Sequence, residues 1–278
     1  MRYLLYVFFI LLTVVVIYHI YRKLSYTLPK IIWSYWEKDI PPLIQAILDD
    51  RARNLPGWKH IHLDETTCRH YIHQPFPSNY HTLSPPHKAD WIRLALLIEY
   101  GGCWMDSAII VNSQDELDDM YVNSCRSMSE FTGFYLERLV FQQNITTYIE
   151  NWFIMAPVRS RFIQTVMNEY TKAIDLGFDA YKSIALQTAP SAEHIYKLSG
   201  TYLTQHVCIQ VALYKVNPVI LLYRAEDSMM KLNYECDFKS PCIMEKIRDE
   251  KSVRNRIPFM KLTSHERATN IDILQYFQ

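Results

Sequence analysis

Residues 87–111 read HKADWIRLALLIEYGGCWMDSAIIV, and this stretch decides the fold. Its first half predicts a helix with large apolar residues along one side. Two adjacent glycines, Gly101 and Gly102, then end the helix, and they stand out because the chain has only 6 glycines. An apolar strand follows, with a single carboxylate, Asp106, set in it. A buried charge costs on the order of several kcal/mol unless a partner neutralises it, so we expect Asp106 to face a metal ion or a cationic neighbour.

The polar groups of this stretch have structural and functional interpretations. Asp106 is either a structural carboxylate that accepts backbone N–H bonds, or the group through which a hard divalent cation meets a diphosphate. Asp90 and Arg93 lie three apart on the polar side of the helix and are neighbours there. They form either a surface ion pair worth under about 1 kcal/mol, or a site. In that site Arg93 meets a phosphate or holds Asp106, and Asp90 binds a hydroxyl or a base edge. The pair Gly101-Gly102 caps the helix and, as a second consequence, lets a ligand approach the strand closely.

Strands and helices alternate along the chain. We predict strands over residues 30–36, 58–63, 103–111, 131–141, 152–157, 219–223 and 258–262, and helices after Pro41-Pro42, up to Tyr100, over 159–176 and on through 213. The alternation up to residue 110 indicates a mostly parallel sheet with helices on both faces. Ligands bind such sheets at the carboxyl ends of the strands. Tyr35-Trp36 and Asp106 are predicted at such ends, so we expect them to share one site.

The N-terminus differs from the rest of the chain. Residues 3–21 carry no formal charge and are rich in Leu, Val, Ile and Phe. A helix of this length just crosses a bilayer core of about 30 Å. A signal peptide is the alternative, but the run is long for one and no A-x-A-like cleavage site follows. We therefore predict an uncleaved membrane anchor over residues 1–24 and a single domain over residues 25–278.

Composition excludes several classes of protein. The chain is 49% hydrophobic, 21% charged and 14% aromatic with a net charge of +0, which is typical of a globular protein and gives no basic excess for nucleic acid. The cysteines form no C-x-x-C pattern, which argues against a zinc site. Cys236 and Cys242 are spaced to close a small loop in an oxidising compartment. Asn144-Ile145-Thr146 is a glycosylation sequon, usable only in a lumenal domain.

Aromatic and histidine residues supply further candidates. Trp33, Tyr35 and Trp36 are either core aromatics or a platform for base stacking, and their place at a strand end favours stacking for at least one of them. His265 lies in KLTSHE near the C-terminus. It is either an exposed histidine or part of a C-terminal segment that closes over a bound nucleotide.

Four segments occur in order between residues 28 and 265: PKIIWSYW, HKADWIRLALLIEYGGCWMDSAIIV, NWFIMAP and KLTSH. Together they resemble the capsular polysaccharide synthesis protein family, which is related to the family 32 glycosyltransferases with their DxD sugar-binding region. The resemblance implies an α/β fold of the GT-A type, in which a Rossmann-like mixed sheet is flanked by helices. It further implies transfer of a sugar from a nucleotide-diphosphate donor to a glycan or polysaccharide acceptor. It also implies a hexosyltransferase-like enzyme, with retention by analogy with family 32. The alternative is a degenerate membrane protein that binds glycans or nucleotide sugars without turnover.

The resemblance also implies roles for individual residues. The catalytic candidates are Asp106 and Arg93; the donor-binding candidates are Trp33, Tyr35, Asp90, Arg93, Gly101, Gly102, Thr188 and Lys261; the metal candidates are Asp106 and His265. Asp106 takes the first position of DxD, but Ala108 stands at the second. A lone carboxylate is a poor cage for the expected Mn²⁺ or Mg²⁺. Thr188 opens Thr-Ala-Pro, which is similar to a Thr-Gly-Pro turn beside the donor in family 32.

The expected location follows from the predicted anchor. A eukaryotic or viral enzyme of this kind faces the Golgi lumen as a type II single-pass protein, whereas bacterial relatives work on the cytosolic face of the inner membrane. A single N-terminal span and the sequon at Asn144 favour the first arrangement.

Overall fold

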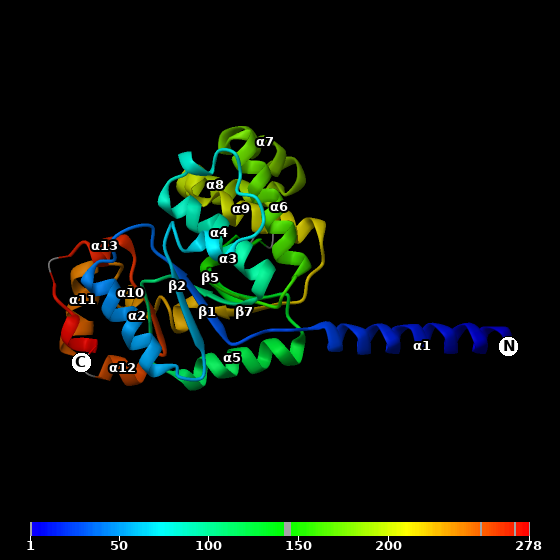
Figure 1. The fold of residues 1–278 in the computed structure, drawn as a ribbon, viewed down its shortest axis with the longest axis horizontal. Coiled ribbons are helices and arrows are strands. Elements are labelled where there is room, and N and C mark those ends of the chain that lie inside the picture. Colours follow the sequence, from blue (N-terminus) through cyan, green and yellow to red (C-terminus); the bar gives the residue numbers. More distant parts are fainter. Residues whose placement is uncertain (1, 142–145, 251, 270, 278) are drawn as a thin grey trace.

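A mixed six-stranded sheet forms the centre of the molecule (Figure 1). The structure is a computed structural model that describes residues 2–141, 146–250, 252–269 and 271–277. The strand order is β2-β1-β3-β6-β5-β7, and a separate two-stranded sheet pairs β4 with β8. The mixed sheet with its flanking helices confirms the predicted α/β class.

The first half of the sheet is parallel, as the alternation predicted. Strand β1 (Ile31–Tyr35) pairs in parallel with β2 (Lys59–Leu63) on one side and β3 (Gly102–Met105) on the other. Helix α2 (Pro42–Asn54) connects β1 to β2, and α4 (Pro85–Tyr100) precedes β3. Parallel neighbours bring the carboxyl ends of β1 and β3 to one edge of the sheet.

The second half corrects the prediction of a mostly parallel sheet. Strand β6 (Thr146–Ala156) is antiparallel both to β3 and to β5 (Phe131–Phe141), whereas β7 (Ile220–Arg224) runs parallel to β5. A physical reason is the short connection between β5 and β6, since a parallel pair needs a crossover of about a dozen residues or more.

The predicted strand over 103–111 is two strands rather than one. It breaks at Asp106, whose carbonyl accepts the N–H of Ile109 at 3.1 Å in a turn. After the turn, β4 (Ile109–Val111) leaves the central sheet and pairs antiparallel with β8 (Phe259–Lys261). The break brings Lys261 of the C-terminal region towards Asp106.

Helices surround the sheet. The remaining helices are α3 (Cys68–Tyr71), α5 (Gln114–Ser127), α6 (Arg161–Leu176), α7 (Phe178–Thr188), α8 (Glu193–Ser199), α9 (Thr204–Lys215), α10 (Lys231–Glu235), α11 (Ser240–Asp249), α12 (Ser252–Arg256) and α13 (Ser264–Arg267). Helix α6 falls within the helix predicted over 159–176, and Phe162 and Val166 lie on its buried face. Helices α5 and α10 to α12 were not predicted.

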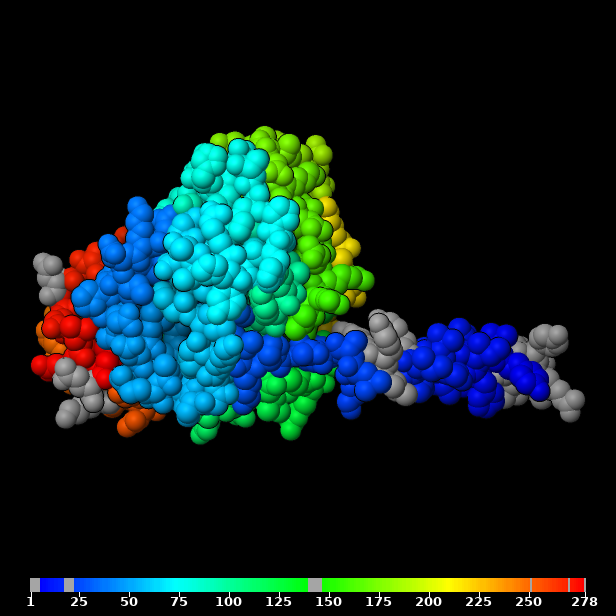
Figure 2. Space-filling view, in the orientation of Figure 1, coloured from blue at the N-terminus to red at the C-terminus, as the bar shows by residue number. Residues whose placement is uncertain are grey.

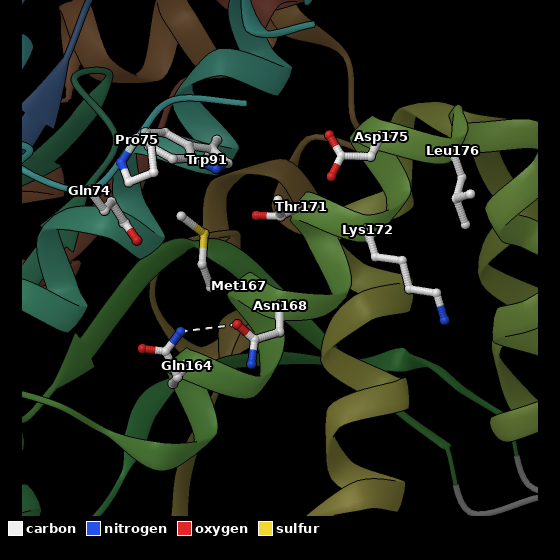
Figure 3. Close-up of a pocket in the computed structure, with 10 residues that line it drawn as sticks. All are labelled: Gln74, Pro75, Trp91, Gln164, Met167, Asn168, Thr171, Lys172, Asp175 and Leu176. Carbon is white, nitrogen blue, oxygen red and sulfur yellow. Dashed lines mark hydrogen bonds between the residues drawn. The ribbon is translucent and has the colours of Figure 1, made fainter. Parts of the chain in front are cut away.

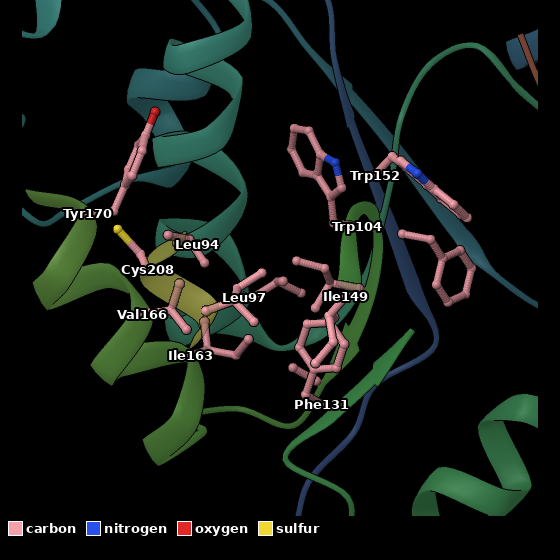
Figure 4. Close-up of a cluster of buried hydrophobic side chains, with 14 of the residues drawn as sticks. Leu94, Leu97, Trp104, Phe131, Ile149, Trp152, Ile163, Val166, Tyr170 and Cys208 are labelled. Atoms are coloured by element: carbon pink, nitrogen blue, oxygen red, sulfur yellow. The ribbon is translucent and has the colours of Figure 1, made fainter. Parts of the chain in front are cut away.

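Two hydrophobic clusters hold the molecule together. The larger one lies between the sheet and helices α4, α6 and α9, where Leu94 and Leu97 gather with Ile163, Val166 and Phe131 (Figure 4). The smaller one joins α2 and β4 to β8 and the C-terminal helices. Burial in the second cluster therefore fixes the C-terminal region against the α2 side of the parallel half.

Helix α1 (Arg2–Ser25) projects from the body of the molecule (Figures 1 and 2). The sequence predicts a membrane anchor over residues 1–24. Within the described part of the chain, no helix combines the length and the apolar character that a bilayer span requires. The sequon residue Asn144 lies outside the described residues.

Candidate functional site

A cavity of about 620 Å³ opens at the carboxyl ends of β1 and β3, and Asp106 lies on its wall. Its lining includes Tyr35, Trp36, Glu37 and Lys38 after β1; Asp90 and Arg93 of α4; Asp106, Ser107 and Ala108 after β3; Tyr148, Glu150, Asn151 and Trp152 of β6; Tyr202 and His206; and Lys261, Thr263 and Arg267. The edge of the sheet that the alternation predicted as a ligand site thus carries the polar cavity.

Asp106 is surrounded by cations and an indole rather than by main-chain amides. Its Oδ2 accepts a hydrogen bond from Lys261 Nζ at 2.9 Å, and its Oδ1 accepts one from Trp104 Nε1 at 2.9 Å. The Arg93 guanidinium lies 3.5 Å from Oδ1. Burial raises the pKa of the Asp106 carboxyl, but Lys261 and Arg93 outweigh burial and hold the pKa below its ordinary value. Asp106 therefore stays ionised and has the cationic neighbours that its place in an apolar segment requires.

Asp90 and Arg93 do not form the surface ion pair that was one of the two interpretations. Both residues are buried, and Arg93 Nη1 lies 3.0 Å from Asp90 Oδ1. Helix α4 is buried on all sides over residues 90–97, which corrects the prediction of a solvent-facing polar side. Of the functional alternatives for Arg93, the geometry matches contact with Asp106.

Asn151 and Gln205 complete this buried network, although the sequence predicted no role for them. Arg93 Nη1 donates to Gln205 Oε1 at 3.0 Å, and Asn151 Nδ2 donates to the same oxygen at 2.7 Å. Gln205 Nε2 in turn donates to the Asp90 carbonyl at 2.6 Å. The sequence contains only a weak indication that these two residues belong to a site. Asn151 is the first residue of the quoted segment NWFIMAP, and Gln205 is one of several polar residues among apolar ones in α9.

Arg51 of α2 positions the turn that carries Asp106. This fully buried residue donates through Nη2 to the carbonyls of Asp106, Ser107 and Ile109 at 3.1, 3.2 and 2.9 Å. Burial lowers the pKa of Arg51 to about 10, which leaves it charged at neutral pH. Three carbonyls converging on one guanidinium explain why the strand breaks at Asp106.

The aromatic residues of β1 divide between core and cavity. Trp33 is buried away from the cavity, and its Nε1 donates to the Gly101 carbonyl at 2.9 Å. Tyr35 lines the cavity, although its hydroxyl is engaged by Glu65 at 2.9 Å. Trp36 also lines the cavity, and the Arg267 guanidinium lies 5.7 Å from the centre of its ring. Trp36 is therefore the residue of the three that is placed to stack on a ligand.

Gly101 and Gly102 lie at the opposite end of β3 from Asp106 and do not line the cavity. Both have positive φ, 65° and 97°. A Cβ on Gly101 would lie 2.7 Å from the Val158 nitrogen, and one on Gly102 would lie 2.7 Å from the Ile31 carbonyl oxygen. The glycine pair permits close packing of backbone on backbone at the end of β3 away from the cavity.

Thr188 and His265 lie away from the cavity lining, whereas Lys261 belongs to it. Thr188 ends α7, and its hydroxyl donates to the Ile184 carbonyl at 3.5 Å. His265 is exposed on α13. Two residues further on, Arg267 does line the cavity, a position that the quoted segment KLTSH does not reach.

The lining of the cavity includes a second polar pair. Glu150 and His206 are buried, with Glu150 Oε2 and His206 Nε2 3.3 Å apart. The His206 ring stacks on Tyr148 at 5.1 Å. None of these residues was predicted, because they approach one another only when β6 meets α9.

Comparison with known protein families finds one whose sequence pattern matches this chain. The sequence pattern of the capsular polysaccharide synthesis protein family matches residues 15–183. The chain belongs to this family. Membership had been predicted from the four quoted segments, and it is confirmed.

Two curated relatives are named O-glycosyltransferases. PaGT of Phomopsis amygdali is 30% identical over 129 residues, which cover 38% of this chain and 30% of the relative. BraB of Annulohypoxylon truncatum is 27% identical over 167 residues, which cover 54% of this chain and 38% of the relative. The matched region thus spans between 30% and 38% of the length of these relatives.

Two solved glycosyltransferases are similar to the chain at low sequence identity. The galactosyltransferase LgtC, solved with donor and acceptor sugar analogues, has a TM-score of 0.44 and 11% identity, and covers 89% of this chain and 93% of its own. The PaToxG glycosyltransferase has a TM-score of 0.35 and 13% identity, and covers 71% and 86%. No role of any residue follows from these two structures.

The residues around Asp106 do not fit the divalent cation that the family resemblance implies. Both carboxylate oxygens of Asp106 already face Lys261, Trp104 and Arg93. Among the residues that the structure describes, no three His, Cys, Asp or Glu side chains gather into a set that could hold a metal ion. Mg²⁺ and Mn²⁺ prefer about six oxygen ligands, and the carboxylates that line this cavity already face other side chains: Glu37 faces Lys88, Asp90 and Asp106 face Arg93, and Glu150 faces His206.

A second hollow, of about 520 Å³, lies between α4 and α6 (Figure 3). Its wall includes Trp91, Met167 and the polar side chains of Gln164 and Asn168, which bond to each other at 3.1 Å. It shares no lining residue with the cavity at Asp106. The cluster of buried charges lies at the other cavity, so the candidate site is there.

Proposed function

We propose that this chain is a glycosyltransferase with a GT-A type fold, which moves a hexosyl group from a nucleoside diphosphate donor to a hydroxyl group of a glycan acceptor. The family assignment and the two relatives named O-glycosyltransferases support the class of reaction. The mixed sheet, with its polar cavity at the carboxyl ends of parallel strands, supports the type of fold.

The observation that carries the proposal is the cationic cluster around Asp106. Lys261 and Arg93 contact its carboxylate, and Arg267 lines the same cavity beside Trp36. When the bond between sugar and diphosphate breaks, negative charge grows on the departing diphosphate. Fixed cations next to that charge stabilise the transition state more than the ground state, which is usually the largest contribution to the rate.

Each residue of the cluster has a distinct role in this proposal. Arg93 and Lys261 face the leaving group, and the Asp106 carboxylate orients both of them. Arg51 holds the turn on which Asp106 lies. Trp36 offers an aromatic surface to the nucleoside base. Glu150 and His206, which also line the cavity, are the polar groups that face an acceptor hydroxyl.

The stereochemical part of the proposal is retention of the anomeric configuration. Its support is the resemblance to family 32, because no residue of the cavity identifies a mechanism by geometry alone. Proton NMR of the first product separates the two outcomes, since the α and β anomers differ in the coupling of the anomeric proton. A product of inverted configuration would contradict retention and leave sugar transfer itself intact.

Sugar transfer is tested by incubating the full chain with a panel of nucleotide sugars and glycan acceptors. We expect release of nucleoside diphosphate and a product heavier by one hexose in mass spectrometry. Asp106→Asn should lower the rate by about 100-fold or more, as for the loss of a preorganised electrostatic group. Asp249→Asn, at an exposed ion pair with Arg248, is the matched control and should leave the rate unchanged.

Two results would contradict the proposal. If wild type and Asp106→Asn process every donor equally poorly, the cavity is not catalytic. If nucleoside diphosphate binds but no sugar moves to any acceptor, the degenerate binding protein is the better description.

We also propose that the domain faces an oxidising compartment such as the Golgi lumen. The support is the disulfide between Cys236 and Cys242, which closes the small loop that the sequence indicated. Disulfides persist in such compartments and are rare where thiols are kept reduced. Mass spectrometry of the protein from its native source, after alkylation without reduction, should show these two cysteines unmodified; alkylated Cys236 and Cys242 would contradict the proposal.

A further inference from the structure

The C-terminal region brings two cations, Lys261 and Arg267, to the wall of the cavity. We propose that these side chains, with Arg93, hold the donor diphosphate in place of a divalent metal ion, so that donor binding is independent of metal. This inference rests on the proposed function, because a diphosphate is the ligand only if the donor is a nucleotide sugar.

The carboxylate that would bind a metal is already neutralised by side chains. Asp106 Oδ2 lies 2.9 Å from Lys261 Nζ, and Oδ1 accepts from the Trp104 indole and faces Arg93. A divalent ion bound there would lie next to two positive charges. Like charges so close together in a partly buried site repel each other strongly.

The neighbouring positions offer no replacement ligand. Ala108 stands where a DxD motif has its second carboxylate, and the Ser107 hydroxyl is directed to the Tyr35 carbonyl at 3.0 Å. The other carboxylates of the lining are engaged elsewhere: Glu37 pairs with Lys88 at 2.6 Å, Glu150 faces His206, and Asp90 belongs to the buried network around Arg93. The donor set thus lacks the oxygens that Mg²⁺ or Mn²⁺ requires.

Arg267 is the cation best placed to bind an anion. Its Nη1 donates to the Leu262 carbonyl at 2.8 Å, and its guanidinium lies over the Trp36 ring. Within the described ranges of the chain, no carboxylate forms an ion pair with it. A guanidinium has five N–H groups and binds phosphate oxygens through two of them at once. The remaining donors of Arg267 therefore suit a diphosphate that lies between it and Lys261.

Lys261 is held in position for the same ligand. The ammonium group lies 5.7 Å from the centre of the Trp152 ring, and its side chain is 16% exposed, so it is accessible from the cavity without being free in solvent. The pairing with Asp106 fixes where the ammonium points. The diphosphate thus binds Arg267 directly and shares Lys261 with Asp106.

Calorimetric titration of the full chain with UDP and with GDP tests the inference. We expect the same Kd, within twofold, in excess EDTA and in millimolar Mn²⁺ or Mg²⁺. Arg267→Gln should raise Kd by at least tenfold because it removes the bidentate charged contact. Arg267→Lys keeps the positive charge but loses the paired N–H donors of the guanidinium. Its Kd should lie between those of wild type and Arg267→Gln. Arg248→Gln, at an exposed arginine of α11, is the matched control and should bind like wild type.

Asp106→Asn gives a test that depends on sign. If side-chain cations hold the diphosphate, removal of the nearby negative charge leaves Kd unchanged or lowers it. If a metal ion bound to Asp106 holds the diphosphate, the same change raises Kd by tenfold or more in the presence of Mn²⁺. The amide still accepts the Trp104 indole N–H, so the fold is expected to persist, which circular dichroism checks.

The outcomes separate this inference from the proposed function. Binding of UDP or GDP only when Mn²⁺ or Mg²⁺ is present overturns the inference and leaves sugar transfer standing. Wild-type affinity in Arg267→Gln likewise overturns the inference alone. No binding of either nucleotide under any condition, together with no transfer, overturns both.

Discussion

Two clusters of the same three residue types lie at opposite edges of the central sheet. At the carboxyl edge, Asp106 accepts from Lys261 at 2.9 Å and from the Trp104 indole at 2.9 Å. At the amino edge, Asp118 of α5 accepts from Lys30 at 2.6 Å and from the Trp58 indole at 3.1 Å. The two aspartate side chains are nearly equally exposed, at 26% and 28%.

The difference between the clusters lies in what surrounds them. Asp118 attaches α5 to the start of β1 and contacts no second cation among the described residues. Asp106 also faces Arg93, lies on the turn that Arg51 holds, and opens onto the cavity with Arg267. The same local contacts therefore attach α5 to the sheet at one edge and belong to a candidate reaction site at the other. Position relative to the ends of the parallel strands makes the distinction.

The largest expected effect comes from Arg93→Met, which removes the cation that has no counterpart at the amino edge. Asp90 would then be buried with its charge unpaired, and we expect a loss of about 3–5 kcal/mol in the free energy of unfolding. Urea unfolding measures this loss. Asp90→Asn in the same chain should recover part of it, because the unpaired charge is removed. A double variant no more stable than Arg93→Met would contradict the pairing.

Gly102→Ala tests the packing at the amino edge and is expected to cost about 3 kcal/mol. The methyl group would lie 2.7 Å from the Ile31 carbonyl, and the residue has φ of 97°. Gly200→Ala is the matched control: φ is 56° there and no atom lies within 4 Å of the added Cβ, so only the backbone strain of about 1 kcal/mol remains. Thermal unfolding compares the two, and equal losses would show that the close approach at Gly102 is unimportant.

Cys236→Ser tests how much the disulfide stabilises the C-terminal region, which supplies Lys261 to the cluster at the carboxyl edge. The disulfide with Cys242 closes a loop with a sequence separation of 6. Loss of the disulfide should lower the free energy of unfolding by about 2 kcal/mol, mainly because the unfolded chain gains conformational entropy. Chemical unfolding with and without a reductant measures this: wild type in reductant should match the variant, and a variant as stable as oxidised wild type would contradict the estimate.

The sequence predicts the elements that depend on neighbouring residues. Strands β1 and β2 and helices α2, α4 and α6 follow from apolar periodicity and from prolines and glycines at their ends. The strand over 152–157 was predicted, but the antiparallel direction of β6 was not, because sheet direction depends on how distant segments pair. The break at Asp106 was missed for a similar reason, since it requires Arg51, 55 residues earlier in the chain.

The site was predictable only in part, for the same reason. Asp90, Arg93 and Asp106 lie in one quoted segment, and charged residues in an apolar stretch are a visible signal. Their partners are remote: Gln205 lies 112 residues from Arg93, and Lys261 lies 155 residues from Asp106. Lys261 was found through the resemblance, whereas Gln205 was not found at all, because no local pattern marks a residue for a contact formed by tertiary packing.

The smallest effect is expected for Asp118→Asn, which compares the two aspartate clusters directly. Burial raises the pKa of the Asp118 carboxyl, but hydrogen bonds from Lys30, Trp58 and Gln114 outweigh burial and lower it below its ordinary 3.8. A lowered pKa means that the ionised group stabilises the fold above pH 3.8 and that this contribution is lost as the pH falls through the folded-state value. We expect a loss of under about 1 kcal/mol at pH 7, as for other partly exposed pairs.

The measurement is urea unfolding of wild type and Asp118→Asn at pH 7, 5 and 3, with sugar transfer assayed at pH 7. The difference in stability should be constant from pH 7 to 5 and shrink towards pH 3, and transfer should remain at the wild-type rate. Asp106→Asn should change stability by a similar amount but, unlike Asp118→Asn, should cause a large loss of transfer. If Asp118→Asn lowered transfer as much as Asp106→Asn, the position of the carboxylate at the edge of the sheet would not be what distinguishes the reaction site from the attachment.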